Sequence, residues 1–138
     1  GGTIALNAGR DIRVTASTTG TVLAAWAAPT PTTFSTGAAG QGGSITFAAG
    51  RDIALASPSD SRSALMNVNG AAGSQPGAAG SVSFTARNLS ITGRSVGETK
   101  NMINAVGGTG RNGVTGRGGN ITATLTGGMS LDNVIAIA

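Results

Sequence analysis

Apolar and polar residues alternate with a period of two in several short stretches of this chain. In the first stretch the apolar positions are Ile4, Leu6, Ile12 and Val14, with small or polar residues between them. A period of two is typical of strands that bury one face, because successive side chains point to opposite sides of a sheet. The alternation pauses at residues 8–11, Ala-Gly-Arg-Asp, where Gly and Asp favour a turn. The stretch therefore predicts two strands joined by a turn.

The same stretch occurs four times. The glycines that open the copies are Gly2, Gly43, Gly80 and Gly119, which lie 41, 37 and 39 residues apart. Self-similarity at such a period indicates a solenoid, a propeller or an array, because one repeat cannot bury its apolar face alone. The predicted core consists of the apolar residues of the four copies: Ile4, Leu6, Ile12, Val14, Ile45, Phe47, Ile53, Leu55, Val82, Phe84, Leu89, Ile91, Ile121, Met129 and Leu131.

The turn between the two strands is shorter in the third copy. The first apolar residues of the two strands lie 8 residues apart in the other copies, but 7 apart from Val82 to Leu89. The third copy lacks the glycine that the turn has elsewhere. We therefore expect either a tighter turn there or a local shift of register.

A third apolar stretch follows in each copy and predicts a third strand. These stretches cover residues 21–25, 64–68, 102–106 and 133–137. In the second and third copies, Leu65 and Asn67 superpose on Ile103 and Ala105, although the sequence leaves open which face points inward.

Connectors rich in Gly and Ala then lead to the next copy, at residues 37–42, 70–79 and 107–118. Such segments are often flexible linkers. Because they recur once per repeat, we instead expect a fixed side of the coil, where small residues let neighbouring backbones approach closely.

These elements predict an all-β fold, a right-handed parallel β-helix of about four coils, each with roughly 37–41 residues and three short strands. Handedness follows from the usual crossover rule. The chain forms a single segment, with coils at about 1–41, 42–78, 79–117 and 118–138. Open strand edges at both ends would favour pairing with further coils or with another chain. Since the chain begins at Gly, we expect a processed product or a part of a longer rod.

Composition narrows the possible partners. Aromatic residues make up 3% of the chain and charged residues 10%, which suits a narrow aliphatic core. The net charge is +4, but the basic residues are scattered and no aromatic residues lie among them, so we expect no nucleic-acid partner. The absence of Cys excludes a disulfide framework. No apolar run is long enough for a membrane span.

The phrase Gly-Gly-x-Ile-x-Leu/Phe-x-Ala-Gly-Arg-Asp-Ile, at residues 1–12 and 42–53, resembles the repeats of filamentous-haemagglutinin-type exoproteins. These are large bacterial adhesins exported by two-partner secretion. The resemblance is strong in the first two copies, partial in the third and limited to the first strand and hydrophobic frame in the fourth. It implies a secreted or surface-attached bacterial fibre that mediates adhesion, without catalytic residues.

The turns of neighbouring copies should stack their charged residues into a ladder. The ladder comprises Arg10, Asp11, Arg51, Asp52, Arg87 and Asn88. Acidic side chains there favour Asx-turns that bond to their own backbone, with arginines to neutralise them. Asp11 and Asp52 are also candidate Ca²⁺ ligands, because Ca²⁺ takes oxygen ligands, and two stacked carboxylates could resemble a glycosidase pair.

Trp26 and Phe34 flank the segment that departs most from the repeat. An exposed Trp is a natural contact for a partner, although it could equally fold over the coil as a local cap.

We expect a structural or adhesive extracellular fibre segment of a bacterial surface or secreted protein. Its partners would be further copies of itself, stacked head to tail, and host-cell or matrix glycans or proteins. The alternative is a carbohydrate-binding or carbohydrate-cleaving β-helix. With no His, no Tyr and only five carboxylates, we expect no enzyme and no cofactor. The five carboxylates are those of Asp11, Asp52, Asp60, Glu98 and Asp132.

Overall fold

The computed structural model of the chain describes residues 1–16, 23–27, 38–57, 65–93, 100–132 and 134–137. The elements in this part of the chain are strands, apart from one 3₁₀ turn at Arg111–Gly113. The first six strands are β1 (Thr3–Ala8), β2 (Ile12–Thr15), β3 (Leu23–Ala24), β4 (Ser44–Ala49), β5 (Asp52–Ser57) and β6 (Met66–Asn67). The next six are β7 (Ser81–Ala86), β8 (Asn88–Gly93), β9 (Lys100–Asn104), β10 (Asn120–Leu125), β11 (Met129–Asp132) and β12 (Val134–Ile137).

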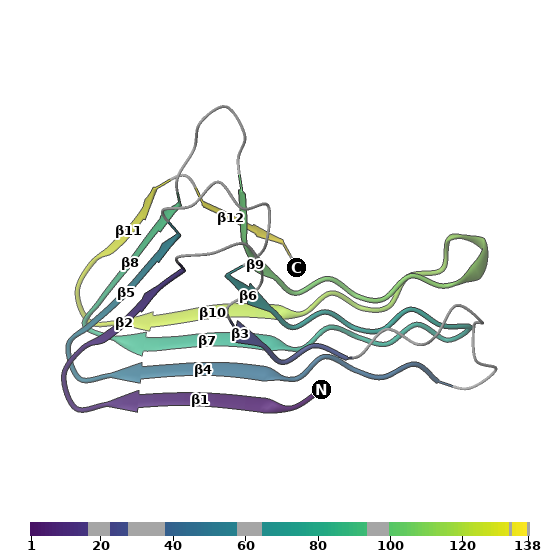
Figure 1. The fold of residues 1–138 in the computed structure, drawn as a ribbon, viewed down its shortest axis with the longest axis horizontal. Helices are drawn as coiled ribbons and strands as arrows, with labels where there is room; N and C mark the ends of the chain where they lie inside the picture. Colours follow the sequence, from purple (N-terminus) through teal and green to yellow (C-terminus); the bar gives the residue numbers. More distant parts are fainter. Residues whose placement is uncertain (17–22, 28–37, 58–64, 94–99, 133, 138) are drawn as a thin grey trace.

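The strands form three parallel four-stranded sheets, which confirms the expected all-β architecture with parallel strands. Their orders are β1-β4-β7-β10, β2-β5-β8-β11 and β3-β6-β9-β12. The chain therefore passes through the three sheets in the same order four times, and each strand of the first three passes pairs with the strand one repeat later (Figure 1). We call the passes β1–β3, β4–β6, β7–β9 and β10–β12 layers 1 to 4.

Alternation along the strands builds the core between the sheets. In the first sheet, Phe47 lies directly opposite Phe84 in the next layer, and the two rings stack with centroids 5.2 Å apart. The predicted core residues that are buried are Ile12, Ile45, Phe47, Ile53, Leu55, Val82, Phe84, Leu89 and Ile91. Those that are partly buried and packed against them are Ile4, Leu6, Val14 and Ile121.

The core prediction was wrong for Met129 and Leu131, which are 58% and 53% exposed. Both lie on β11, the last strand of the second sheet, which pairs with β8 alone. Layer 3 packs against them from one side, and no described layer covers the other. The alternation of apolar and polar residues predicts which face of the sheet a side chain lies on. Burial of that side chain also requires a neighbouring layer on each side.

The shorter turn of the third copy is a tighter turn, and the register is kept. On one side Ser44 pairs with Ser81, and on the other Asp52 pairs with Asn88. The turn of the third copy is one residue shorter, and the Arg51 carbonyl of the layer before it accepts two hydrogen bonds. The donors are the N–H groups of Arg87 (2.7 Å) and Asn88 (3.0 Å).

The predicted superposition of the third strands was wrong by one residue. Met66, and not Leu65, pairs with Ile103, so that Asn67 lies opposite Asn104. Leu65 and Met66 are consecutive and both buried. A period of two therefore does not fix the register at this strand.

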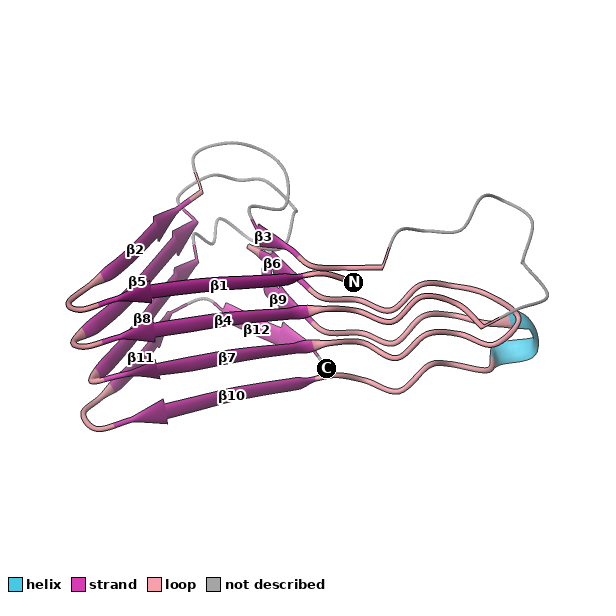
Figure 2. Ribbon diagram, turned by 90° about the horizontal axis from the view of Figure 1, so that it is seen from below, coloured by secondary structure: helices cyan, strands magenta, loops and turns pink. Residues whose placement is uncertain are grey.

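The Gly-rich connectors extend from the sheets as pairs of segments that run out and back in stacked layers (Figures 1 and 2). We call residues 25–27 and 38–43 the first arm, residues 68–80 the second arm and residues 105–119 the third arm. Backbone hydrogen bonds link them, for example from Gly77 N to Ala71 O (2.9 Å) within the second arm. The arms are thus a fixed part of the fold, as the sequence predicted for its connectors.

Glycine is required where the arms touch. A Cβ atom on Gly77 would lie 2.0 Å from the Gly40 carbonyl oxygen, and one on Gly108 would lie 1.8 Å from that of Ala71. Beside these contacts, the small side chains of Ala27, Ala39 and Ala71 form a second buried cluster. Within the described residues, no helix is long and apolar enough to cross a membrane.

Candidate functional site

The first turns of successive layers stack on one another at the edge between the first and second sheets. Arg51 N donates to Arg10 O (2.8 Å), and Arg87 N donates to Arg51 O. The six residues of the predicted turn ladder therefore share one edge of the molecule. Their side chains, however, pair between layers in two different ways.

The Arg51 guanidinium bridges layers 1 and 2 by binding the Asp11 carboxylate through two hydrogen bonds. Nε lies 3.1 Å from Oδ1 and Nη2 lies 2.9 Å from Oδ2. This bidentate geometry is the favoured one for Arg and a carboxylate. The hydrogen bond from Arg51 holds the pKa of Asp11 below its ordinary value, and the charges of Arg51 and Arg10 act in the same direction. Asp11 is therefore ionised at neutral pH.

Asn88 links layers 2, 3 and 4. Its Nδ2 donates to Asp52 Oδ1 (2.8 Å), and its Oδ1 accepts from the backbone N–H of Gly128 (2.9 Å). An amide suits this place because it donates on one side and accepts on the other. The first two layers are thus joined by an ion pair, whereas the amide of Asn88 joins layer 3 to layers 2 and 4.

The two candidate Ca²⁺ ligands face different partners. Asp11 is held by Arg51, whereas Asp52 is held by Asn88. In the part of the chain that the structure describes, no group of three or more His, Cys, Asp or Glu side chains could hold a metal ion. The side chains of the turn ladder therefore join neighbouring layers along a solvated edge. They do so through the Arg51–Asp11 ion pair and the amide bridge of Asn88.

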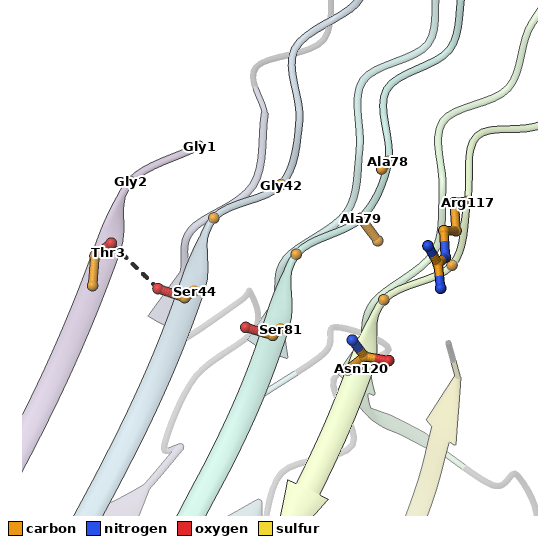
Figure 3. Close-up of a pocket in the computed structure, with 14 residues that line it drawn as sticks. Gly1, Gly2, Thr3, Gly42, Ser44, Ala78, Ala79, Ser81, Arg117 and Asn120 are labelled. Atoms are coloured by element: carbon orange, nitrogen blue, oxygen red, sulfur yellow. Dashed lines mark hydrogen bonds between the residues drawn. The ribbon is translucent and has the colours of Figure 1, made fainter.

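A polar groove of about 530 Å³ crosses all four layers where the arms meet the first sheet. Each layer contributes the first residue of its strand in that sheet, and these are Thr3, Ser44, Ser81 and Asn120. Ser44 Oγ and Thr3 Oγ1 are 3.2 Å apart, and Arg117 lies beside Asn120 at one end of the row (Figure 3). Hydroxyl, amide and guanidinium groups in a row can hydrogen-bond a polar chain lying across the layers.

The sequence analysis did not single out Arg117. The signal was available, since Arg117 occupies the same place before a first strand as Gln41 before Ser44 and Ala78 before Ser81. Arg117 is the charged residue among these three equivalent positions.

An apolar pocket of about 220 Å³ opens between layers 3 and 4. Ala123 lies opposite Phe84 in the register of the first sheet, so the aromatic stack of the inner layers is not continued. Met129 and Leu131 also line this pocket. The core is therefore less completely filled at this end of the stack than in layers 2 and 3.

Trp26 lies at the base of the first arm and is 47% exposed, whereas the neighbouring Ala27 is buried. This exposure leaves Trp26 available to a partner. Phe34, the second aromatic residue of that prediction, lies outside the described residues, as do Asp60 and Glu98.

Comparisons of the chain with protein-family models, with curated proteins and with solved structures found no match. The resemblance to filamentous-haemagglutinin-type repeats therefore rests on the repeated phrase of the sequence.

Proposed function

We propose that the chain is a segment of a right-handed parallel β-solenoid that serves as a structural and adhesive fibre of a bacterial exoprotein, either secreted or held at the cell surface. The observation that carries the proposal is that the chain passes four times through the same three parallel sheets, with the strands in register from layer to layer. Stacked repeats of this kind make extended rods rather than globular domains. The repeated phrase that resembles two-partner-secretion adhesins supports the same assignment.

The mechanism is mechanical. Each layer is bonded to the next by backbone ladders in three sheets, by the pairs of arms and by side-chain bridges such as Arg51 to Asp11. A load along the stack is thus shared by many bonds in parallel. The outer strands β1 and β10 each pair on one side within the chain, and free edges of this kind favour pairing with another chain.

Adhesion can be tested with beads that carry the purified chain. We expect coated beads to be retained on host cells or on extracellular matrix under flow, and to be released by soluble chain in excess. Beads coated with a Trp26→Ala variant should bind less strongly if Trp26 is a partner contact. Retention no greater than that of beads coated with an unrelated protein would contradict an adhesive role.

The polar groove favours a second candidate function, the binding of a glycan by a β-solenoid. It is lined by hydroxyl and amide groups from all four layers and by Arg117. A screen against neutral and acidic polysaccharides tests this function, with Arg117→Ala as the variant expected to lose acidic ligands. Cleavage of such a polysaccharide, with or without Ca²⁺, would favour the enzymatic form of this alternative over the fibre.

A further inference from the structure

The polar groove where the arms meet the first sheet is hollow because its floor consists of glycine. Gly2, Gly43, Gly80 and Gly119 stand directly before the first strand of each layer. A Cβ atom on Gly43 would collide with the Gly2 carbonyl oxygen, and one on Gly80 would collide with the Gly43 carbonyl oxygen. Glycine allows two backbones to approach this closely. The stacking of the layers therefore keeps side chains out of the floor and leaves the groove open along the stack.

The backbone groups along this floor are already engaged between the layers. Ser44 N donates to Gly2 O and Ser81 N donates to Gly43 O, each over 3.0 Å. Asn120 N donates to the glycine carbonyl of the layer before it (3.2 Å). A peptide that adds to a sheet needs unpaired backbone N–H and C=O groups at an edge. Between the described layers the groove offers no such edge, so its ligand must be recognised by side chains.

Those side chains form one row that runs along the stack. Thr3, Ser44, Ser81 and Asn120 each come from one layer, and successive layers lie about 4.8 Å apart. Ser44 Oγ donates to Thr3 Oγ1 (3.2 Å), while Ser81 and Asn120 continue the row without a side-chain hydrogen bond to any described residue (Figure 3). A hydroxyl or an amide both donates and accepts. One such group for each layer matches the hydroxyl groups of successive sugars in an extended glycan, whose repeat is close to the spacing of the layers.

Arg117 adds a positive charge to this row at layer 4. Among the described residues that line the groove, it has the one charged side chain, and no acidic side chain lies there to neutralise it. Arg117 is exposed and lies beside Asn120 (Figure 3). A guanidinium fits a planar carboxylate through two parallel hydrogen bonds, as Arg51 binds Asp11 elsewhere in this chain. Charge and shape thus both favour a carboxylate as the group that meets Arg117.

We propose that the groove binds a linear polysaccharide of uronic acids, which lies along the stack with about one sugar to each layer and a carboxylate on Arg117. The row of hydroxyl and amide groups binds the sugar hydroxyls, and the guanidinium selects the acidic form of the glycan. This inference rests on the glycan-binding function proposed for the groove and names the class of glycan.

The test is isothermal titration calorimetry of the purified full chain with a short oligomer of β-linked mannuronic acid and with its methyl ester, which has the same length and no charge. We expect the acidic oligomer to bind saturably and the ester to bind about tenfold more weakly. Arg117→Ala should weaken binding of the acidic oligomer by about tenfold, towards the affinity of the ester. Arg111→Ala is the matched control, because it removes the same charge from the same arm outside the groove, and it should leave the affinity unchanged.

Two results would overturn this inference while leaving glycan binding in place. They are equal affinity for the acidic oligomer and its ester, and equal affinity of Arg117→Ala and the unaltered chain for the acidic oligomer. Equal losses in Arg117→Ala and Arg111→Ala would also overturn it, because they would show attraction by net charge alone. Binding of neither oligomer would overturn it as well, and the glycan-binding function would fall with it if the screen of polysaccharides also found no ligand.

Discussion

The guanidinium of Arg51 binds the carboxylate of Asp11 through two hydrogen bonds of 2.9 and 3.1 Å, although the residues lie 40 positions apart in the sequence. The contact joins the same turn in two successive repeats. It shows how a repeated phrase becomes a contact between layers: the arginine of one copy meets the aspartate of the copy before it. Such pairs fix the stacking at the solvated edge, while apolar side chains fix it inside.

The Asp11 pair makes stability depend on pH in the acid range. The pKa of Asp11 in the folded chain lies below its ordinary value of 3.8. Its contribution to stability is therefore complete above that pH and is lost as the pH falls through the folded-state pKa. We expect the melting temperature to fall on acidification in this window, and to fall less in Asp11→Asn. The effect should be small and weakened by salt, since the Arg51 side chain is exposed and that of Asp11 is only half-buried.

The aromatic stack should dominate core stability. Phe84→Ala removes a buried ring that stacks on Phe47, and we expect a loss of about 3–5 kcal/mol in the free energy of unfolding. Phe84→Leu keeps most of the volume and should cost less than about 1.5 kcal/mol. Urea unfolding followed by circular dichroism measures both. Equal losses in the two variants would show that the ring is not packed between layers.

A glycine should tolerate replacement by alanine only where no backbone lies opposite, and Gly108 in the third arm and Gly2 before β1 are the two contrasting cases. Gly108→Ala places a Cβ 1.8 Å from the Ala71 oxygen, whereas Gly2→Ala meets nothing within 4 Å. We expect the first change to cost more than about 2 kcal/mol and the second to stay within about 0.5 kcal/mol. Thermal unfolding of the two variants side by side provides the comparison. A Gly108→Ala variant as stable as Gly2→Ala would contradict the close packing of the arms.

The amide bridge of Asn88 is expected to matter more than its place on the surface suggests. Asn88→Ala removes the partner of Asp52 and of the Gly128 N–H, and we expect a loss of about 0.5–1.5 kcal/mol. Thr85→Ala is a suitable control, because Thr85 lies in the same layer with an exposed side chain. Hydrogen exchange at Gly128 should become faster in Asn88→Ala alone. Unchanged exchange there would show that the bridge does not form in solution.

Periodicity predicted the strands of the first two sheets because one face of each is buried and the other is not. Ile45, Phe47, Ile53 and Leu55 alternate with small or polar residues, and all four are buried. The register of the third strands could not be predicted in this way, because the adjacent Leu65 and Met66 are both buried. A two-residue period cannot set a register where neighbouring positions face the core alike.

The contacts between the arms could not be read from the sequence, although their fixed course was expected. Gly and Ala have no polar or large side chain that would define a contact. The sequence of residues 70–79 therefore does not predict which N–H group donates a hydrogen bond to which carbonyl. The turn ladder was easier to predict, because Arg51 and Asp11 belong to the same repeated phrase. Its pairing, with Asp52 bound to Asn88, depends on the substitution of Asn for Asp in one copy.

The most direct test of the proposed fibre is negative-stain electron microscopy of the purified chain, together with its mass in solution over a range of concentrations. The account predicts unbranched rods as thin as a single stack, which lengthen with concentration. Ile135→Pro, which removes a ladder donor from β12, should prevent this growth while the chain stays folded. Compact particles with the mass of one chain at every concentration, or rods that also form in the proline variant, would contradict assembly through the strand edges.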